Sequence, residues 1–268
     1  MKLIVSDLDG TLLNEESKIS EYTKNIVKKL NKMGVEFIIA TGRGEASAIR
    51  IKKQLGIDAY IICNNGANIY DKDENMIFEK VISKEIAYEL LKLLREEKVN
   101  YNCFLHDDFF RDEYDTTDYS QRIGFTEHIL IDLKECSELN KIIIVDKEDV
   151  ILSLSKKLRE NFSQLVEITI SDPTCVDIVP KECSKGKALE VIAKKLNVEF
   201  SNIIAFGDAE NDLDMLKKVG HPVAMENAQS VVKKFIKNRA KKNTENGVAK
   251  YLENYFNLWN WHFLWEII

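Results

Sequence analysis

Short apolar runs along the chain alternate with segments in which apolar residues recur every three to four positions. The runs predict buried strands, and the recurrence predicts helices that bury one face. The predicted strands cover residues 3–5, 35–40, 59–63, 202–206 and 222–225, and the predicted helices cover residues 20–33, 49–55, 188–196, 213–219 and 228–236. Alternating strands and helices form parallel sheets with right-handed crossovers, so we expect an α/β fold with a Rossmann-like core.

The middle third of the chain has a different pattern. Its predicted helices cover residues 83–97 and 149–162, and its predicted strands cover residues 141–145, 166–170 and 175–179. The last two strands alternate polar and apolar residues around a turn at Asp172-Pro173, which indicates antiparallel pairing. We therefore predict a core of residues 1–80 and 184–268, with a separate α+β domain of residues 81–183 inserted into it.

Two carboxylates follow the first predicted strand. Asp7 and Asp9 stand two residues apart and are followed by Gly10 and Thr11. The carboxyl end of a core strand is where open α/β sheets bind ligands. Two neighbouring acids repel each other, and a bound cation would remove that penalty. Hard divalent cations prefer oxygen ligands, so this segment is a candidate metal site.

Further polar residues follow the other predicted core strands and helices. Together with the first pair they form four clusters: Asp7/Asp9, Thr41-Gly42-Arg43, Lys185, and Asp208/Asn211/Asp212. Carboxylates can hold one hard cation, whereas a lysine, a threonine hydroxyl, an asparagine amide and turn N–H groups can hold an anion. This combination suits phosphoryl transfer, which depends mainly on positioning and charge stabilisation. In such a reaction one aspartate could act as the nucleophile and its neighbour as the general acid/base.

The clusters resemble, in order and spacing, the four motifs of the haloacid dehalogenase (HAD) superfamily. The matching segments are D-L-D-G-T-L at residues 7–12, T-G-R at 41–43, S-K-G at 184–186 and G-D-A-E-N-D at 207–212. Residues 65–67, 223–228 and 246–249 resemble its Cof-type branch, whose members are phosphatases with an α/β cap inserted between the second and third motifs. The resemblance covers the core, and the inserted domain matches in position and rough composition.

This resemblance implies roles for the acidic residues. Asp7 would attack phosphorus and form an aspartyl-phosphate, while Asp9 would protonate the leaving group and then activate water. Mg²⁺ would be bound by Asp7, the backbone carbonyl of Asp9 and Asp208. Asp212 would support the metal directly or through water.

The resemblance also implies an anion site. The phosphate would lie against the Leu8 backbone and against Thr41, Gly42, Lys185 and Asn211. Arg43 is a candidate for contacting the substrate or the cap, and equally for pairing with a carboxylate. The cap would close over the site, exclude solvent and select the leaving group.

The predicted function is therefore a Mg²⁺-dependent phosphatase of small phosphorylated metabolites, such as sugar phosphates, phosphorylated cofactors or nucleotides. One alternative is a phosphomutase on the same core, which the position of the large cap disfavours. The other is a non-catalytic sensor of phosphorylated metabolites. A sensor would keep the anion site but would not need Asp9.

The composition of the chain bears on its binding partners and its location. The formal net charge is −6 and no long basic run occurs, which argues against nucleic-acid binding. No apolar run reaches the roughly 20 residues of a membrane helix, and the first residues lack a signal-peptide pattern. We expect a cytoplasmic monomer or homodimer without membrane attachment. The five cysteines lack C-x-x-C spacing and are expected to be reduced and mostly buried.

Two segments lie outside this scheme. His106-Asp107-Asp108 could suggest a second metal site, but an exposed cap loop is the favoured interpretation. The tail, residues 257–268, holds all three tryptophans and is too short to span a bilayer. We expect it to pack on the protein's own surface or to be locally disordered, with a dimer contact or a membrane-surface contact as alternatives.

Overall fold

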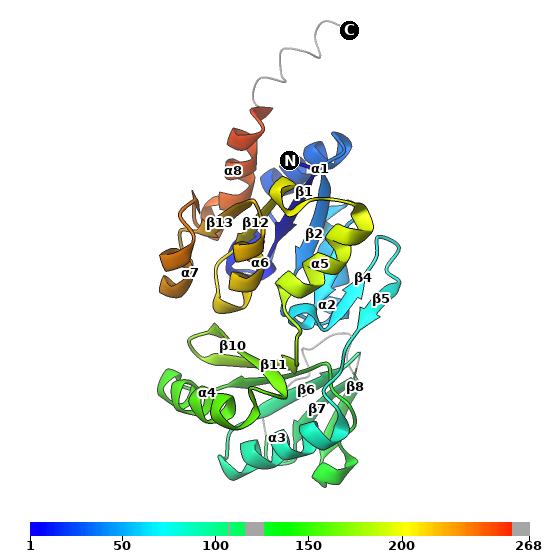
Figure 1. The fold of residues 1–268 in the computed structure, drawn as a ribbon, viewed down its shortest axis with the longest axis vertical. Coiled ribbons are helices and arrows are strands. Elements are labelled where there is room, and N and C mark those ends of the chain that lie inside the picture. Colours follow the sequence, from blue (N-terminus) through cyan, green and yellow to red (C-terminus); the bar gives the residue numbers. More distant parts are fainter. Residues whose placement is uncertain (107, 116–125, 259–268) are drawn as a thin grey trace, which may run out of the picture.

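Two β-sheets form the centres of two layers, one above the other in Figure 1. The computed structural model describes residues 1–106, 108–115 and 126–258. The upper layer is built from the first and last thirds of the chain, and the lower layer from the middle third (Figure 1). Each sheet has an apolar cluster of its own. The expected domain limits stay a prediction.

The larger sheet has the strand order β14-β13-β12-β1-β2-β3-β4-β5. Its strands are β1 (Leu3–Ser6), β2 (Glu36–Ala40), β3 (Tyr60–Cys63), β4 (Asn68–Tyr70), β5 (Met76–Glu79), β12 (Ile203–Gly207), β13 (His221–Met225) and β14 (Arg239–Ala240). β1 is central and pairs in parallel with β2 and β12. All four of its residues are buried, as its apolar run predicts for a strand covered on both faces.

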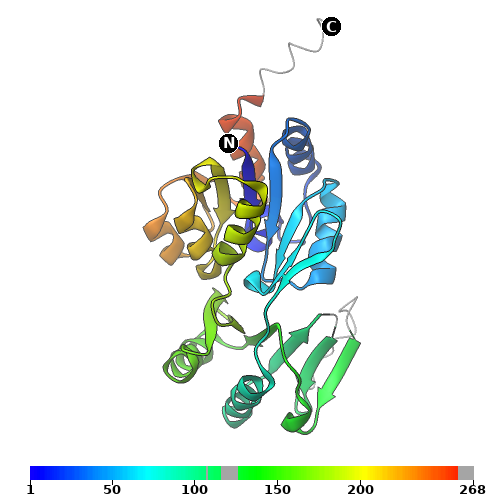
Figure 2. The same cartoon turned by 45° about the vertical axis from the view of Figure 1, so that its right-hand side comes forward.

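Helices pack on both faces of this sheet (Figure 2). They are α1 (Glu21–Lys32), α2 (Glu45–Leu55), α5 (Lys185–Leu196), α6 (Leu213–Lys218), α7 (Ser230–Phe235) and α8 (Gly247–Tyr255). The predicted N-cap is present: the Ser20 hydroxyl accepts a hydrogen bond from the backbone N–H of Thr23, which helix formation would otherwise leave unpaired. The α/β fold class is confirmed.

Two strands of this sheet, β4 and β5, were not predicted from the apolar pattern of the sequence. β4 and β5 form an antiparallel hairpin on β3. β4 has only three residues, and its first residue is the polar Asn68. That side chain is buried because its amide donates to Glu79 and its oxygen accepts from Asn64. A polar residue in so short a run masks the apolar signal of a strand.

The smaller sheet has the order β10-β11-β9-β6-β7-β8. Its strands are β6 (Tyr101–Leu105), β7 (Asp108–Asp112), β8 (Thr126–Leu130), β9 (Lys141–Val145), β10 (Val166–Asp172) and β11 (Cys175–Pro180). The pairs are antiparallel, as expected, except that β7 and β8 are parallel. Helices α3 (Lys84–Glu96) and α4 (Glu148–Phe162) lie on the side away from the larger sheet, so the open face of the smaller sheet is turned toward the core (Figure 1).

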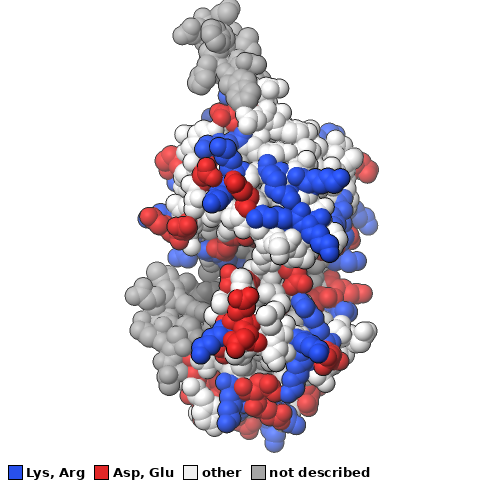
Figure 3. All heavy atoms as spheres, turned by 90° about the vertical axis from the view of Figure 1, so that its left-hand side faces the viewer, with Lys and Arg blue, Asp and Glu red and all other residues white. Residues whose placement is uncertain are grey.

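Other expectations can be compared with the described residues. All five cysteines are free and buried, as predicted. Asp107 lies outside the described residues, while Asp108 pairs with His128 at 2.7 Å. Of the aromatic tail, residues 259–268 lie outside the described residues. Within the described chain, no helix combines the length and apolar character needed to cross a bilayer. Acidic and basic side chains are interspersed over the face drawn in Figure 3.

Candidate active site

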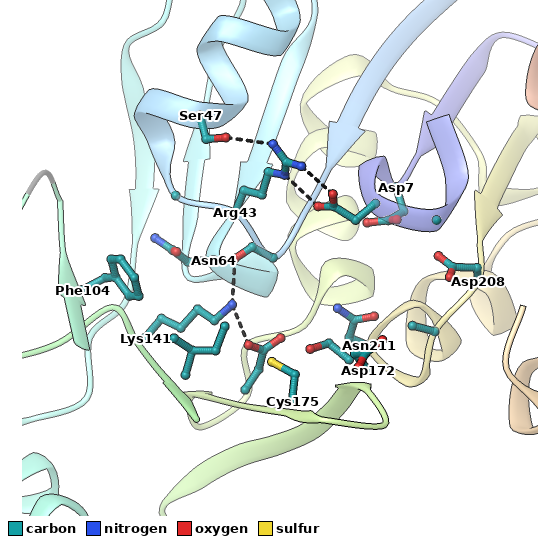
Figure 4. Close-up of a pocket in the computed structure, with 18 of the residues that line it drawn as sticks. Asp7, Arg43, Ser47, Asn64, Phe104, Lys141, Asp172, Cys175, Asp208 and Asn211 are labelled. Carbon is teal, nitrogen blue, oxygen red and sulfur yellow. Dashed lines mark hydrogen bonds and ion pairs between the residues drawn. The ribbon is translucent and has the colours of Figure 1, made fainter. Parts of the chain in front are cut away.

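The carboxyl ends of the central parallel strands open into a cavity of about 680 Å³ between the core and the smaller sheet, which we call the cap (Figure 4). The core contributes Asp7, Asp9, Gly42, Arg43, Asp208 and Asn211, and the cap contributes Phe104, Lys141, Asp172, Cys175 and Asp177. The cavity therefore has a strongly polar floor and a mixed polar and apolar roof. Its volume is that of a small-molecule site.

Three carboxylates gather at the floor of the cavity and just beneath it. One oxygen each of Asp7, Asp208 and Asp212 lies within 4.8 Å of the others. Burial, together with the Asp212 and Asp208 carboxylates, raises the pKa of Asp7 well above its usual range despite the opposing charge of Lys185. Burial and the Asp212 carboxylate raise the pKa of Asp208 to about 7. A cluster so costly to ionise fits a hard divalent cation, which would favour the charged carboxylates as ligands.

Lys185 links two of these acids. Its Nζ lies 2.6 Å from Asp7 Oδ1 and 2.7 Å from Asp212 Oδ1. Burial alone would lower the pKa of Lys185, but the Asp212 and Asp7 carboxylates outweigh it and raise that pKa above its ordinary value. The ammonium therefore stays charged beside the candidate nucleophile. From there it can also stabilise an incoming anion.

Asp212 uses its second oxygen within its own loop. Asp212 Oδ2 accepts hydrogen bonds from the backbone N–H of Asp208 at 2.8 Å and of Ala209 at 3.1 Å. Its Oδ1 is occupied by Lys185. The structure thus places Asp212 where it orients the loop that carries Asp208. These contacts fit a supporting part in the metal site.

The turn after β1 is shaped around Asp208. Thr11 Oγ1 donates to Asp208 Oδ1 at 2.9 Å. Gly10 has a φ of +73°, and a Cβ there would lie 2.3 Å from Asp208 Oδ2. Glycine is needed at this position for both reasons, because other residues disfavour positive φ and the space is filled by the carboxylate.

The predicted phosphate-binding residues lie around the next turn. Thr41 is fully buried, and its Oγ1 accepts from the backbone N–H of Arg43 at 3.0 Å. Asn211 reaches the same turn and donates from Nδ2 to Asn65 Oδ1 at 3.0 Å. A Cβ on Gly42 would lie 3.0 Å from that Asn65 oxygen. The turn, Asn65 and Asn211 thus form one packed unit.

The Arg43 guanidinium forms an ion pair with the carboxylate of Asp9 in this structure. Its Nε is 2.7 Å from Asp9 Oδ2 and its Nη2 is 2.5 Å from Asp9 Oδ1. Ser47 Oγ lies 3.2 Å from Nη1 and holds the guanidinium from the helix α2 side. Of the partners considered for Arg43, the carboxylate is the one seen here.

Three residues of this region were not predicted from the sequence as site residues. Asn65 was noticed only as part of a motif, although an Asn-Gly pair after a strand signals a left-handed turn, and its φ is +53°. Lys141 and Asp177 come from the cap and reach the core side of the cavity. No local signal marks them, because a single charged residue in a strand is usually solvated.

Comparison with known proteins decides the family. A family model of haloacid dehalogenase-like hydrolases matches residues 4–252, nearly the whole chain. The chain belongs to the haloacid dehalogenase-like hydrolases. The predicted superfamily is confirmed, and so is the predicted enzyme class, a phosphoric monoester hydrolase.

Relatives and solved structures of this hydrolase family cover most of the chain. A 5-amino-6-(5-phospho-D-ribitylamino)uracil phosphatase of Bacillus subtilis is 28% identical over 95% of this chain and 96% of its own. The HMP-PP phosphatase of Serratia proteamaculans is 29% identical over 88% of this chain and 87% of its own. A solved haloacid dehalogenase-like hydrolase from B. subtilis aligns with a TM-score of 0.84 and 27% identity over 94% of this chain and 99% of that one.

Proposed function

We propose that this hydrolase is a Mg²⁺-dependent phosphatase of small phosphorylated metabolites that acts through an aspartyl-phosphate on Asp7. One observation carries the proposal: Asp7 and Asp208 line the floor of a cavity large enough for a small metabolite, and the buried Lys185 and Asp212 complete their cluster just beneath that floor. Phosphoryl transfer needs a nucleophile, a cation and an anion site at one point, and this cluster supplies the groups for all three.

The donor set fits magnesium. Asp7 and Asp208 would hold Mg²⁺ through carboxylate oxygens, with the backbone carbonyl of Asp9 as a further ligand and Asp212 supporting the loop. Bound there, the ion would neutralise charge on the phosphoryl oxygens. Lys185 would hold another of these oxygens, and Thr41, Asn211 and the backbone of Leu8 and Gly42 would complete the anion site.

The chemistry divides between two aspartates. A carboxylate oxygen of Asp7 attacks phosphorus, the bond from phosphorus to the leaving oxygen breaks, and Asp9 gives that oxygen a proton. Asp9 then takes a proton from water, whose oxygen attacks phosphorus and releases inorganic phosphate from Asp7. Since Arg43 occupies both oxygens of Asp9 here, we propose that the substrate replaces one of these two bonds when it binds, while the other bond keeps Asp9 oriented.

The substrate class rests on the cavity and on relatives. A volume of about 680 Å³ suits a metabolite rather than a phosphoprotein loop. The Bacillus and Serratia relatives are named for small phosphorylated compounds. We propose the same broad class for this chain, which includes sugar phosphates, phosphorylated cofactors and nucleotides. A cytoplasmic location and a monomeric or homodimeric state belong to this proposal, and sedimentation of the purified protein tests the latter.

A phosphate-release screen over a broad metabolite panel tests the proposal. The wild-type protein should release phosphate from at least one compound with Mg²⁺, and Asp7→Asn should release none. Tight binding of a metabolite without turnover would favour the sensor alternative. An isomeric phosphate ester formed without phosphate release would favour the phosphomutase alternative.

A further inference from the structure

A buried ion pair in the cap faces the core. Lys141 on β9 and Asp177 on β11 lie on neighbouring cap strands, and Lys141 Nζ is 2.6 Å from Asp177 Oδ1. Their side chains are 6% and 1% exposed. A buried ion pair loses the hydration of both charges, so it persists only where further hydrogen bonds satisfy its remaining polar atoms. The partners that supply those bonds show what the pair holds in place.

Those further bonds leave the cap. Lys141 Nζ donates to the backbone carbonyl of Gly42 at 2.9 Å, and Asp177 Oδ2 accepts from Asn65 Nδ2 at 2.9 Å. Lys141 points from its cap strand toward the core in Figure 4. Both partners belong to the core turns that surround the candidate phosphate site. The pair therefore bridges the cap to the anion site itself.

The contact with Asn65 sets the direction of two amides. An ionised carboxylate can only accept hydrogen bonds, so Asn65 must turn its NH₂ group toward Asp177 and its oxygen toward Asn211. Asn211 then donates one N–H of its amide to Asn65 Oδ1, at 3.0 Å. The amide has a second N–H, which we infer is the donor to a bound ligand. Among the described residues, the buried Asn211 Oδ1 has no hydrogen-bond partner. The orientation of Asn211 thus follows from the charge of Asp177.

The contact with Gly42 fixes the second part of the anion site. A lysine bonded to the Gly42 carbonyl holds the peptide group between Gly42 and Arg43 in one orientation. The N–H of that peptide donates to Thr41 Oγ1 at 3.0 Å, which orients the threonine hydroxyl. Both effects require the cap to be seated on the core, because Lys141 and Asp177 belong to the cap whereas Gly42 and Asn65 belong to the core. The two pairs are 99 and 112 residues apart in the chain.

We propose that Lys141 and Asp177 are positioning residues that, when the cap is seated, hold the Gly42 turn and the Asn65–Asn211 amide pair in the geometry that binds the phosphoryl group. The proposal rests on the proposed phosphatase function. It differs from a contact between the cap and the leaving group. A positioning pair should affect the binding of every phosphate ester, and also the binding of free inorganic phosphate, which has no leaving group.

The test compares Lys141→Met, Asp177→Asn and the double variant. The double variant matters because each single change leaves a partner buried without its counter-charge, which can destabilise the fold. Arg159→Gln is the matched control: it removes another cap–core ion pair, between Arg159 and Glu210 at 3.2 Å. In the described chain, the hydrogen bonds of these two side chains join them to each other and to the backbone of Ile168 and Ile170. Circular dichroism and the unfolding temperature establish that each variant is folded.

The decisive measurement is calorimetric binding of inorganic phosphate in the presence of Mg²⁺. We expect the double variant to bind phosphate roughly 10-fold more weakly than wild type, as expected when a hydrogen bond to a charged group is lost. Arg159→Gln should bind phosphate as wild type does. With any substrate found, the single-turnover rate of phosphoryl transfer should fall in the double variant.

Three outcomes would overturn the proposal. In the first, the folded double variant binds phosphate as tightly as wild type. In the second, Arg159→Gln weakens binding equally, so that general cap seating explains the effect. In the third, only KM for one substrate changes, which indicates a leaving-group contact. If phosphate binding responds as expected but no ester is hydrolysed by wild type, the positioning role stands and the phosphatase proposal fails.

Discussion

Arg43 holds both carboxylate oxygens of Asp9, with Nε 2.7 Å from Oδ2 and Nη2 2.5 Å from Oδ1. A fork-shaped guanidinium fixes the plane of a carboxylate as well as its charge. Asp9 is the proposed acid/base, and 58% of its side chain is exposed. The arginine therefore supplies orientation that packing does not. A leaving-group oxygen needs only one of the two Asp9 oxygens, so Arg43 can keep its bond to the other.

Removal of this guanidinium should slow catalysis. We expect Arg43→Met to lower kcat/KM roughly 10-fold, less than the 10²–10⁴-fold expected for Asp9→Asn, because the acid/base would be misdirected but still present. Steady-state kinetics on a substrate from the screen measure both variants. Ser47→Ala is the control, since it removes a contact of Arg43 and leaves the bonds to Asp9 intact. Equal rates for wild type and Arg43→Met would show that Asp9 needs no orientation by Arg43.

Alanine at Gly10 should separate backbone strain from damage to the site. Gly10 and Gly34 both have positive φ, +73° and +82°, but a Cβ on Gly34 meets nothing within 4 Å. Each alanine should destabilise the fold by roughly 1–2 kcal/mol in denaturant unfolding. Only Gly10→Ala should also lose Mg²⁺-dependent turnover, because its Cβ would displace the Asp208 carboxylate. Unaltered turnover in a folded Gly10→Ala protein would contradict this account of the turn.

Removal of the divalent cation should abolish turnover and lower thermal stability together. Asp7, Asp208 and Asp212 repel one another without a cation. Mg²⁺ at about 100 times its Kd should therefore raise the free energy of unfolding by about 2.7 kcal/mol. Differential scanning calorimetry with and without a chelator measures the effect. Asp208→Asn should respond less to Mg²⁺, since it lacks one proposed ligand. Full activity of the wild type in excess chelator would exclude a required metal.

His221, outside the site, should contribute a loss of stability in mild acid, opposite in sign to the contribution of Asp7 and Asp208, whose pKa values are raised. Burial lowers the pKa of His221 below its ordinary 6.5. The unfolded chain then binds a proton more readily than the folded one, so this contribution to stability is complete above pH 6.5 and declines as the pH falls through the lower, folded-state pKa. The neutral ring contacts the Tyr251 hydroxyl, with Nε2 2.7 Å from it.

Urea unfolding at a series of pH values tests this. His221→Gln keeps a polar side chain of similar reach and cannot titrate in this range. As the pH falls from 6.5 to 5, the free energy of unfolding of this variant should rise relative to that of wild type, because the groups other than His221 are the same in both proteins. Parallel curves for the two proteins would assign the acid sensitivity to other groups.

The candidate site was largely foreseeable because most of its residues follow strand ends. Parallel strands bring their carboxyl ends to one edge of a sheet, so Asp7, Thr41 and Asp208 had to lie near one another once the strands were identified. The short apolar runs identified those strands. Ser20 marked the start of a helix through a hydrogen bond to a residue only three positions further along the chain. These signals are local, and local signals can be read from sequence.

The tertiary structure alone decided which partners the charged residues took. The approach of the turn after β1 brought Asp9 within reach of Arg43, while a contact of Arg43 with the substrate stays a prediction. Lys141 and Asp177 carry no local sign of their role, because their partners lie 99 and 112 residues away in the chain. The hairpin β4–β5 was hidden for the same reason: Asn68 is buried only because Glu79 and Asn64 satisfy its amide. A polar side chain shows where it can bond, and the fold determines which partner comes within reach.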